Sequence, residues 1–548
     1  MSSPDSEPDV QPPAALHSVL ESLAADARRA LVDEGDPRRA SDSLQAALAY
    51  AERELAATDP AFVPLRRALG AALHAAGDLA AAGVQYEAAL EGARRLFGED
   101  HAETARCLND YGQLLQTQGR MEEARGCYEH ALRTVQSGRD SQRLETAMCI
   151  NNLGRLFHDL GQLPATLPYY QRSLDIREDA LGVAHPVTAE SVNNVGTALD
   201  SMGDLEGAQR CLAAALAVVE AARGQDHPER AQILNNLGRV AGACGRHAEA
   251  IAHYRESLRI FRLRLGPRHI LCGQVSNNLG LACESALDLE AARTAYEEAI
   301  SIFNERLGPA HSNTAVAVSN LGCLLQRLGD TAAAEAAHAR ALAIRRRSLG
   351  DEHPVTAQSV SNYAIVLQMM GRHAEALALH QEVLANFELT RGPTHAETAR
   401  GHNNIGSCLN ALGRTDQALL AFQQSVAAFR VSAPAHPSLA QALDNCGAML
   451  ALQGRLEEAA DASREACSIL EQAAAGGDHP NLAASLNNLG LIELARGNDV
   501  VAMPLLERAQ AMFERTVPAE DAALLRLREL RHELEQEREA AGAVAALA

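Results

Sequence analysis

Lysine and tryptophan are both missing from this chain of 548 residues, and aromatic residues make up only 3% of it. All 49 basic residues are therefore arginines. Without lysine the chain cannot contain the Gly-Lys-Ser/Thr phosphate loop, the protein-kinase lysine or a Schiff-base nucleophile. The 70 acidic residues give a net charge of −21. This balance argues against a general nucleic-acid binder, which needs a basic face.

The cysteines and the chain start point to a reducing compartment. The eleven cysteines are dispersed, odd in number and without a Cys-x-x-Cys pair. A disulfide framework is denser and even, so we expect free thiols used as small core residues. Residues 1–13 are polar and acidic, unlike a signal peptide. No run approaches about 18 uninterrupted apolar residues, so we expect no membrane span and a cytoplasmic location.

A motif recurs with a step of 42 residues along most of the chain. The string His-Pro-Val-Thr-Ala begins at His185 and at His353, and related starts occur at seven more histidines: His101, His227, His269, His311, His395, His436 and His479. An asparagine pair typically follows eight residues later, then an apolar residue and a small one. A second glycine, such as Gly203, comes seven residues after the small residue, and Leu287 replaces it once. Such a period predicts one array of stacked units.

Each unit contains the signals of two helices. Prolines such as Pro186 stand at the expected first helical position, where the missing N–H needs no partner. The second glycine ends this first helix. In the second helix two small residues recur seven apart, for example Ala292 and Ala299, with a bulkier residue such as Tyr296 between them. Small residues at these points allow close helix packing.

The small residue, the second glycine, the paired alanines and the aromatic together resemble the tetratricopeptide repeat. The 42-residue period, with openings such as Asp226-His227-Pro228 and the string Asn-Asn-Leu-Gly, resembles the kinesin light chain subtype. This resemblance implies an all-α fold: an α-solenoid of stacked antiparallel helix pairs in a right-handed superhelix, with the first helices lining the inner wall. The coiled coil by which that family docks onto its motor is not recognisable here, so we do not expect a motor-adaptor role.

On this basis we expect four parts. Residues 1–13 form a disordered N-terminal tail, and residues 14–58 form a degenerate first helix pair. Residues 59–518 form eleven units of 42 residues, and residues 519–548 form a C-terminal capping helix and tail. Leucines such as Leu524 and Leu527 make one apolar stripe in the cap, and a terminal unit needs the polar outer face that surrounds this stripe.

Catalytic and metal-binding motifs are missing from the array. The recurring histidines lie one unit apart, near 10 Å, whereas metal ligands lie about 2 Å from their ion. We interpret them as residues that shape the turn between units. No His-Glu-x-x-His helix, Gly-x-Ser-x-Gly elbow or dinucleotide-binding loop occurs. We therefore expect no enzyme, no cofactor and no metal site.

The asparagine pairs are the main candidate site. On a helical wheel the first asparagine lies at the centre of a polar sector, which we interpret as the inner wall of a groove. An amide offers a donor and an acceptor to an extended peptide backbone, and in the resembled family equivalent asparagines hold cargo peptides. The candidate ligand-binding column is Asn109, Asn151, Asn193, Asn235, Asn277, Asn403 and Asn487.

The second asparagines lie at the groove edge, beside the partner helix. Besides binding a ligand they can tie one first helix to the next, and the sequence leaves both roles open for both columns. This second column is Asn152, Asn194, Asn236, Asn278, Asn320, Asn362, Asn404, Asn445 and Asn488.

Charged residues share the polar sector with the asparagines. Arg106, Arg155 and Arg239 there form either a patch for an acidic peptide or part of a mixed polar wall. The leading hypothesis is a non-catalytic scaffold that binds a protein segment or extended peptide in this groove, without nucleic acid or membrane. The alternatives are a structural self-assembling repeat protein and a ligand-responsive sensor. The oligomeric state and the partner's identity stay open.

Overall fold

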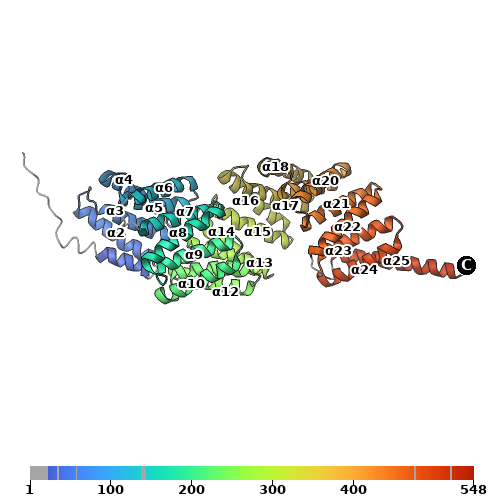
Figure 1. Ribbon diagram of the computed structural model, residues 1–548, viewed down its shortest axis with the longest axis horizontal. Coiled ribbons are helices and arrows are strands. Elements are labelled where there is room, and N and C mark those ends of the chain that lie inside the picture. Colours follow the sequence, from blue (N-terminus) through green and yellow to red (C-terminus); the bar gives the residue numbers. More distant parts are fainter. Residues whose placement is uncertain are drawn as a thin grey trace, which may run out of the picture. The chain divides into compact units, whose positions relative to one another are not determined.

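The computed structural model describes residues 22–33, 36–56, 58–137, 143–473, 477–518 and 521–547. Every regular element in these residues is a helix, which confirms the all-α solenoid. The chain divides into two compact units, Met1–Leu328 (unit 1) and Gly329–Ala548 (unit 2), and each unit is a stack of helix pairs (Figure 1). The tail expected at residues 1–13 lies outside the described residues.

The described part of unit 1 contains α-helical residues 22–28, a short π-helix that follows them, and fourteen further α-helices. Within residues 14–58, where we expect a degenerate helix pair, the described part holds the α-helical residues 22–28, η1 and α2. The elements of the unit are η1 (Arg29–Asp33), α2 (Pro37–Glu54), α3 (Phe62–Ala76), α4 (Leu79–Phe97), α5 (Ala102–Thr117), α6 (Met121–Ser137), α7 (Arg143–Asp159), α8 (Leu163–Leu181), α9 (Pro186–Ser201), α10 (Leu205–Arg223), α11 (Pro228–Ala243), α12 (His247–Arg264), α13 (Ile270–Ser285), α14 (Leu289–Arg306) and α15 (Ser312–Arg327).

Unit 2 contains the remaining ten helices. The last of them, α25, follows the repeats and packs Leu524 and Leu527 against α24 and its neighbours. The helices are α16 (Thr331–Leu349), α17 (Pro354–Met369), α18 (His373–Arg391), α19 (Ala396–Ala411), α20 (Thr415–Ser432), α21 (Pro437–Leu452), α22 (Leu456–Ala473), α23 (Pro480–Ala495), α24 (Asp499–Thr516) and α25 (Ala522–Leu547).

The recurring histidines cap the first helices. In each case the ring Nδ1 accepts a hydrogen bond of 3.1–3.2 Å from the backbone N–H two residues later, as His185 does from Val187. This contact satisfies one of the amides that a helix N-terminus leaves without a partner. The interpretation that these histidines shape the turns between units is therefore confirmed at all nine positions.

The second glycines adopt a backbone conformation that other residues rarely take. Gly203 has a φ of 86°, and its N–H bonds to the carbonyl of Asp200 at the end of α9. Leu287 keeps the same left-handed turn after α13, with a φ of 63° and a side chain that is 73% exposed. Among the described residues it is the only one other than glycine with positive φ.

The small residue of each first helix sets the distance to the second helix of its pair. A Cβ added at Gly238 would lie 2.7 Å from Cε1 of Tyr254, and one at Gly280 would lie 2.6 Å from Cε1 of Tyr296. Both tyrosine rings are buried. The aromatic therefore packs directly on the glycine backbone, so the two helices lie closer than a pair separated by larger side chains could.

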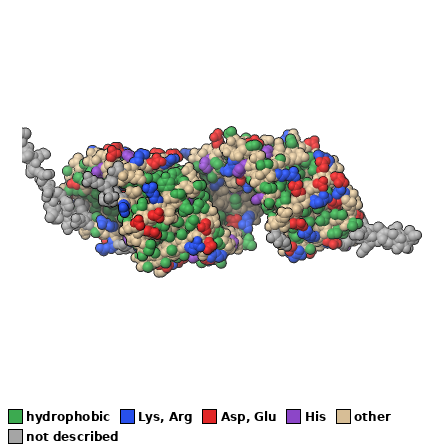
Figure 2. Space-filling view, in the orientation of Figure 1, with side chains coloured by type: hydrophobic (Ala, Val, Ile, Leu, Met, Phe, Trp, Pro, Cys, Tyr) green, Lys and Arg blue, Asp and Glu red, His purple; other side chains and the backbone are tan. Residues whose placement is uncertain are grey.

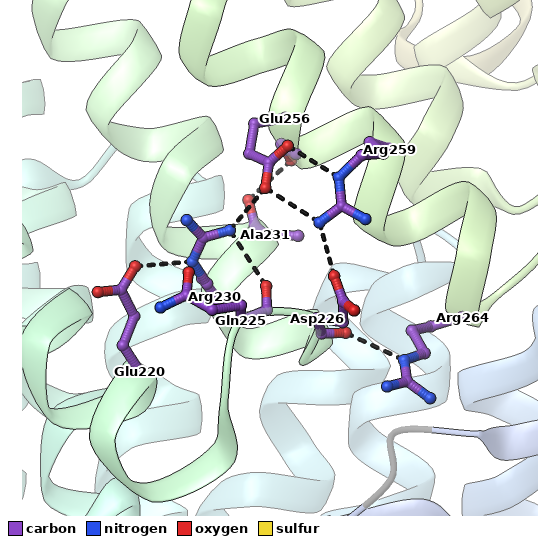
Figure 3. A network of polar contacts seen from close by, with 9 residues as sticks. Glu220, Gln225, Asp226, Arg230, Ala231, Glu256, Arg259 and Arg264 are labelled. Atoms are coloured by element: carbon purple, nitrogen blue, oxygen red, sulfur yellow. Dashed lines mark hydrogen bonds and ion pairs between the residues drawn. The ribbon is translucent and has the colours of Figure 1, made fainter.

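An ion-pair network holds the turn between α10 and α11 against α12 (Figure 3). The Arg230 guanidinium bonds to Glu220 at 2.7 Å and to Glu256 at 2.9 Å, while Arg259 bonds to Asp226 at 2.6 Å and to Glu256. The hydrogen bonds from Arg259 and Arg230 lower the pKa of Glu256 to about 2. The network joins neighbouring repeats, and charges of both signs are mixed over the visible surface (Figure 2).

Replacing Leu287 by glycine tests whether this position is strained. We expect Leu287→Gly to stabilise the turn by about 1 kcal/mol, because the left-handed conformation penalises a Cβ. Amides at the end of α13 and the start of α14 then exchange hydrogen more slowly. The control Leu287→Ala keeps the Cβ and gives no such gain. Equal protection in both variants contradicts the strain assignment.

Candidate functional site

The first helices lie on the inner side of the curve in unit 1. Each of α3, α5, α7, α9, α11 and α13 contacts the first helix of the next repeat, and in unit 2 α21 contacts α23. Among the described residues, the second helices of consecutive repeats contact each other less than these first helices do. Helices that lie closer together form the shorter, concave side of a stack. We call the first-helix face that carries the polar positions the inner wall.

Asparagines of neighbouring repeats bond to one another along this wall. In six cases the second asparagine of one repeat donates through Nδ2 to Oδ1 of the first asparagine of the preceding repeat, at 2.9–3.0 Å. The pairs are Asn152 to Asn109, Asn194 to Asn151, Asn236 to Asn193, Asn278 to Asn235, Asn320 to Asn277, and Asn445 to Asn403. We call this set of bonds the asparagine ladder. It links the first helices of these neighbouring repeats, which is one of the two roles that the sequence left open for the asparagines.

The first asparagines differ in their exposure. Asn109 and Asn151 are buried, at 0% and 2% exposed, and Asn193 and Asn403 are each 7% exposed. The other three, Asn235, Asn277 and Asn487, are half-buried. The ladder bonds to the carbonyl oxygens of the first asparagines and leaves their Nδ2 groups for other contacts, and Nδ2 of Asn193 donates to Asn194 at 3.3 Å. Within the described part of the chain, Nδ2 of Asn235 and of Asn277 donates no hydrogen bond.

Three second asparagines depart from the ladder. Asn362 accepts a 2.9 Å hydrogen bond from Gln358 on its own helix. Asn404 and Asn488 are half-buried and make no side-chain hydrogen bond to another described residue. The ladder is therefore complete over α5 to α15 in unit 1, but in unit 2 it is represented by the single bond between α21 and α19.

The three arginines predicted for an acidic peptide are already engaged. Arg106 bonds to Glu103 at 2.7 Å and to Glu145 at 2.8 Å, and Arg239 bonds to Asp200 at 2.5 Å. Arg155 contacts the amide oxygen of Gln116 at 3.4 Å. These contacts neutralise Arg106 and Arg239 within the wall, as expected of a mixed polar surface.

A second ladder runs near the C-terminal ends of the first helices. Its members are also 43 residues apart, so the same offset could have revealed it in the sequence. The bonds are His74 Nε2 to Thr117 Oγ1 at 2.9 Å, Gln116 Nε2 to Asp159 Oδ2 at 2.6 Å, His158 Nε2 to Ser201 Oγ at 2.8 Å, and Arg327 Nη1 to Glu284 Oε1 at 2.8 Å.

Unit 1 also closes on itself. The Nε2 of His269, at the start of α13, lies 2.6 Å from the carbonyl oxygen of Ala75 at the end of α3, which is 194 residues earlier. Leu79 packs beside it against the cluster of Ile270 and Phe303. Burial lowers the pKa of His269 to about 4, so the neutral ring donates from Nε2. The 42-residue period cannot reveal a contact between successive superhelical turns.

The model of the tetratricopeptide repeat matches eight stretches, of which the last seven overlap, at residues 61–137, 145–221, 188–262, 229–305, 273–347, 313–388, 355–430 and 397–472. The chain belongs to the tetratricopeptide repeat family. This confirms the family expected from the glycine, alanine and aromatic positions. None of the curated proteins matches the chain.

Two solved structures of similar repeats have low overall similarity. BtubC (BKLC) from P. vanneervenii is 22% identical, with 42% of this chain and 92% of that chain covered and a TM-score of 0.37. The nearly identical TPR-like repeats of a putative kinesin light chain from Podosopora anserina are 22% identical, covering 37% and 97% of the two chains, with a TM-score of 0.35.

The described residues contain no cluster of three or more metal-ligating side chains. None of the helices within them has the length and apolar character needed to cross a membrane. All eleven cysteines are free thiols, and seven of them are buried, which confirms their use as core residues. Tetratricopeptide repeats are typically non-catalytic.

The inner wall of the repeats in unit 2 is largely uncharged. At the polar-sector positions of α17, α19, α21 and α23 the sequence has two charged residues, Arg400 and Asp444. Large apolar side chains are exposed at the same positions. They are Ile365, Met369, Leu452 and Leu491, at 39%, 53%, 70% and 40% exposed. In a chain with a net charge of −21, these positions therefore carry little charge and several exposed apolar side chains.

Asp444 replaces the first asparagine in α21 and interrupts the ladder there. Its Oδ2 accepts a hydrogen bond from Ser485, while its buried Oδ1 has no partner among the described residues. Burial raises the pKa of this carboxyl to about 7. The folded protein therefore holds a proton that an unfolded aspartate releases near pH 4.

Asp444 makes the stability of unit 2 depend on pH. Because the pKa of Asp444 is raised in the folded state, its contribution to the free energy of unfolding is fully present below about pH 4. This contribution declines as the pH rises to about 7. We expect Asp444→Asn, which cannot ionise, to raise the midpoint of urea-induced unfolding at pH 8. The midpoint of the variant should also change less between pH 5 and pH 8 than that of the natural protein. An unchanged profile in the variant contradicts this assignment of the protonated state.

Proposed function

We propose that this chain is a non-catalytic protein-interaction scaffold whose inner wall holds a protein segment or extended peptide. Tetratricopeptide repeats generally mediate protein–protein interaction, and the proposal adds the position and chemistry of the contact. The observation that carries it is the asparagine ladder, which repeats one amide per unit along the inner wall of unit 1.

The ladder supports a specific form of recognition. Asn193, Asn235 and Asn277 each have their carbonyl held by the next repeat, so the orientation of the amide is fixed before a ligand arrives. The Nδ2 groups of Asn235 and Asn277 remain as donors and lie one repeat apart. Fixed donors suit the carbonyl groups of a peptide backbone, and preorganisation lowers the entropy lost on binding.

The apolar inner wall of unit 2 supports the same function through a different contact. The side chains of Met369 and Leu452 are more than half exposed, in a chain that is otherwise rich in charged residues. A partner's apolar side chains would remove this area from water, which contributes about 25 cal/mol per Å² before the costs of association. An interaction scaffold accounts for exposed apolar groups that would otherwise lower solubility.

The ladder is tested by two triple variants that break the same three hydrogen bonds. Asn193→Ala/Asn235→Ala/Asn277→Ala removes the proposed ligand contacts. The matched control, with alanine in place of the donors Asn236, Asn278 and Asn320, leaves those first asparagines in place. We expect the first variant to lose bound partners in an unbiased pull-down about tenfold more than the control, because only it removes the donors.

Far-UV circular dichroism shows whether both variants keep their helices, and light scattering shows whether their assembly state changes. Equal loss of partners in the two variants means that the asparagines act only between repeats. Unchanged partners in both variants refute the groove assignment. A chain that is monomeric at micromolar concentration removes the self-assembly alternative.

A further inference from the structure

One buried position in the second helices departs from the repeat. The residue eleven after the first small residue of the second helix is apolar and buried in ten repeats: Ala51, Ala93, Val135, Val219, Phe261, Phe303, Phe387, Phe429, Leu470 and Phe513. In α8 it is Arg177, which is 4% exposed, and in α16 it is Arg345, which is 8% exposed. A guanidinium at a core position loses hydration, so it needs partners that replace water.

Only one edge of Arg177 has such partners. Its Nη1 donates to the carbonyl of Val187 at 3.0 Å, to Ser191 Oγ at 3.0 Å and to Glu190 Oε2 at 3.1 Å. None of these hydrogen bonds uses Nε or Nη2. Those two nitrogens form the other edge of the guanidinium, which matches the two oxygens of a carboxylate.

Arg177 lines an open cavity of about 440 Å³ on unit 1. The cavity has apolar walls, formed by Leu144, Met148, Leu181 and Val187. A volume of this size accommodates a small organic ligand or the end of a peptide. The site therefore combines apolar surface with a fixed cationic group that has unused donors.

The other ionisable groups of the cavity are largely matched among themselves. Arg67 lies 3.3 Å from Asp110, and Arg106 lies 2.8 Å from Glu145. His185 accepts a hydrogen bond at Nδ1 from its own helix, so its neutral ring carries the proton on Nε2. Arg67 and Arg106 each bond to two carboxylates, whereas Arg177 bonds to Glu190 alone and keeps Nε and Nη2 unused.

We propose that this cavity binds a carboxylate carried by an apolar group, with the carboxylate on the Nε–Nη2 edge of Arg177 and the apolar group against Leu144, Met148 and Leu181. The inference rests on the proposed function, because Arg106 and Met148 belong to the inner wall along which the peptide would lie. A phosphate is disfavoured, since its second charge would face Asp110 and Glu145. The carboxylate can come from a peptide terminus, an acidic side chain or a free organic acid.

The probes are three fluorescein-labelled heptapeptide pools with randomised positions and leucine at the end. One pool ends in a free carboxylate and one in an amide, while the third is an amide pool with aspartate before the leucine. We expect immobilised full-length protein to bind the free-acid pool about tenfold more tightly than the plain amide pool, as for a charge-assisted hydrogen-bonded pair. N-acetyl-leucine is tested as a competitor.

Arg177→Met is the decisive variant, and it should fold because the same position is apolar in ten other repeats. We expect it to lower binding of the acid pool to the level of the amide pool. Arg345→Met is the matched control: Arg345 lies at the same repeat position, and its Nη1 bonds to Ser359 as that of Arg177 does to Ser191. This control should keep the preference for the acid pool.

Equal binding of the acid and amide pools to the natural protein overturns the inference, and so does a preference that survives in Arg177→Met. If the aspartate pool binds as the acid pool does, the source is a side chain, and competition by N-acetyl-leucine shows that a free acid suffices. Both results uphold the site. Loss of partners in the asparagine variants without any acid preference rejects the cavity and leaves the proposed function standing.

Discussion

Close contact between helices is the constraint on which the rest of this structure depends. A pair of helices cannot cover its own apolar faces, so each repeat is stable only against its neighbours. Gly238 and Gly280 have no Cβ, so the rings of Tyr254 and Tyr296 pack directly on their backbone and the two helices of each pair lie close together. The same short distances between repeats bring the asparagine amides of consecutive first helices to 2.9–3.0 Å.

Polar groups on the inner wall are arranged by this spacing. First helices that lie close together would leave amides and carboxylates without water, and an unpaired buried polar group destabilises the fold by about 1–3 kcal/mol. Two ladders with the same 43-residue offset satisfy most of these groups. The consequence is a wall whose first asparagines have their carbonyl oxygens held and their Nδ2 donors fixed in direction. Such fixed donors suit the carbonyl groups of a partner's backbone.

Much of the fold follows from the sequence because its signals are local. Histidine caps, prolines at the first helical position and glycines with positive φ each act within a few residues, so the helix boundaries could be predicted. The direction of the asparagine amides could not, since it depends on the angle between neighbouring helices. The contact between His269 and Ala75 also escapes prediction, because it depends on the accumulated rotation of several repeats.

Departures from the repeat differ in what they indicate about function. Leu287, Asp444 and Arg177 each break a pattern that most other repeats keep, and in a solenoid such a change affects mainly the local repeats. Leu287 is strained but exposed, and it offers no polar group to a ligand. Asp444 has an unpartnered oxygen that is buried, so protonation is enough to accommodate it. Arg177 differs from both, because it cannot lose its charge, it bonds through Nη1 alone, and it belongs to the lining of a cavity. A permanent charge, unused hydrogen-bond donors and a cavity occur together at Arg177, and for this reason we propose a ligand there and not at the other two positions.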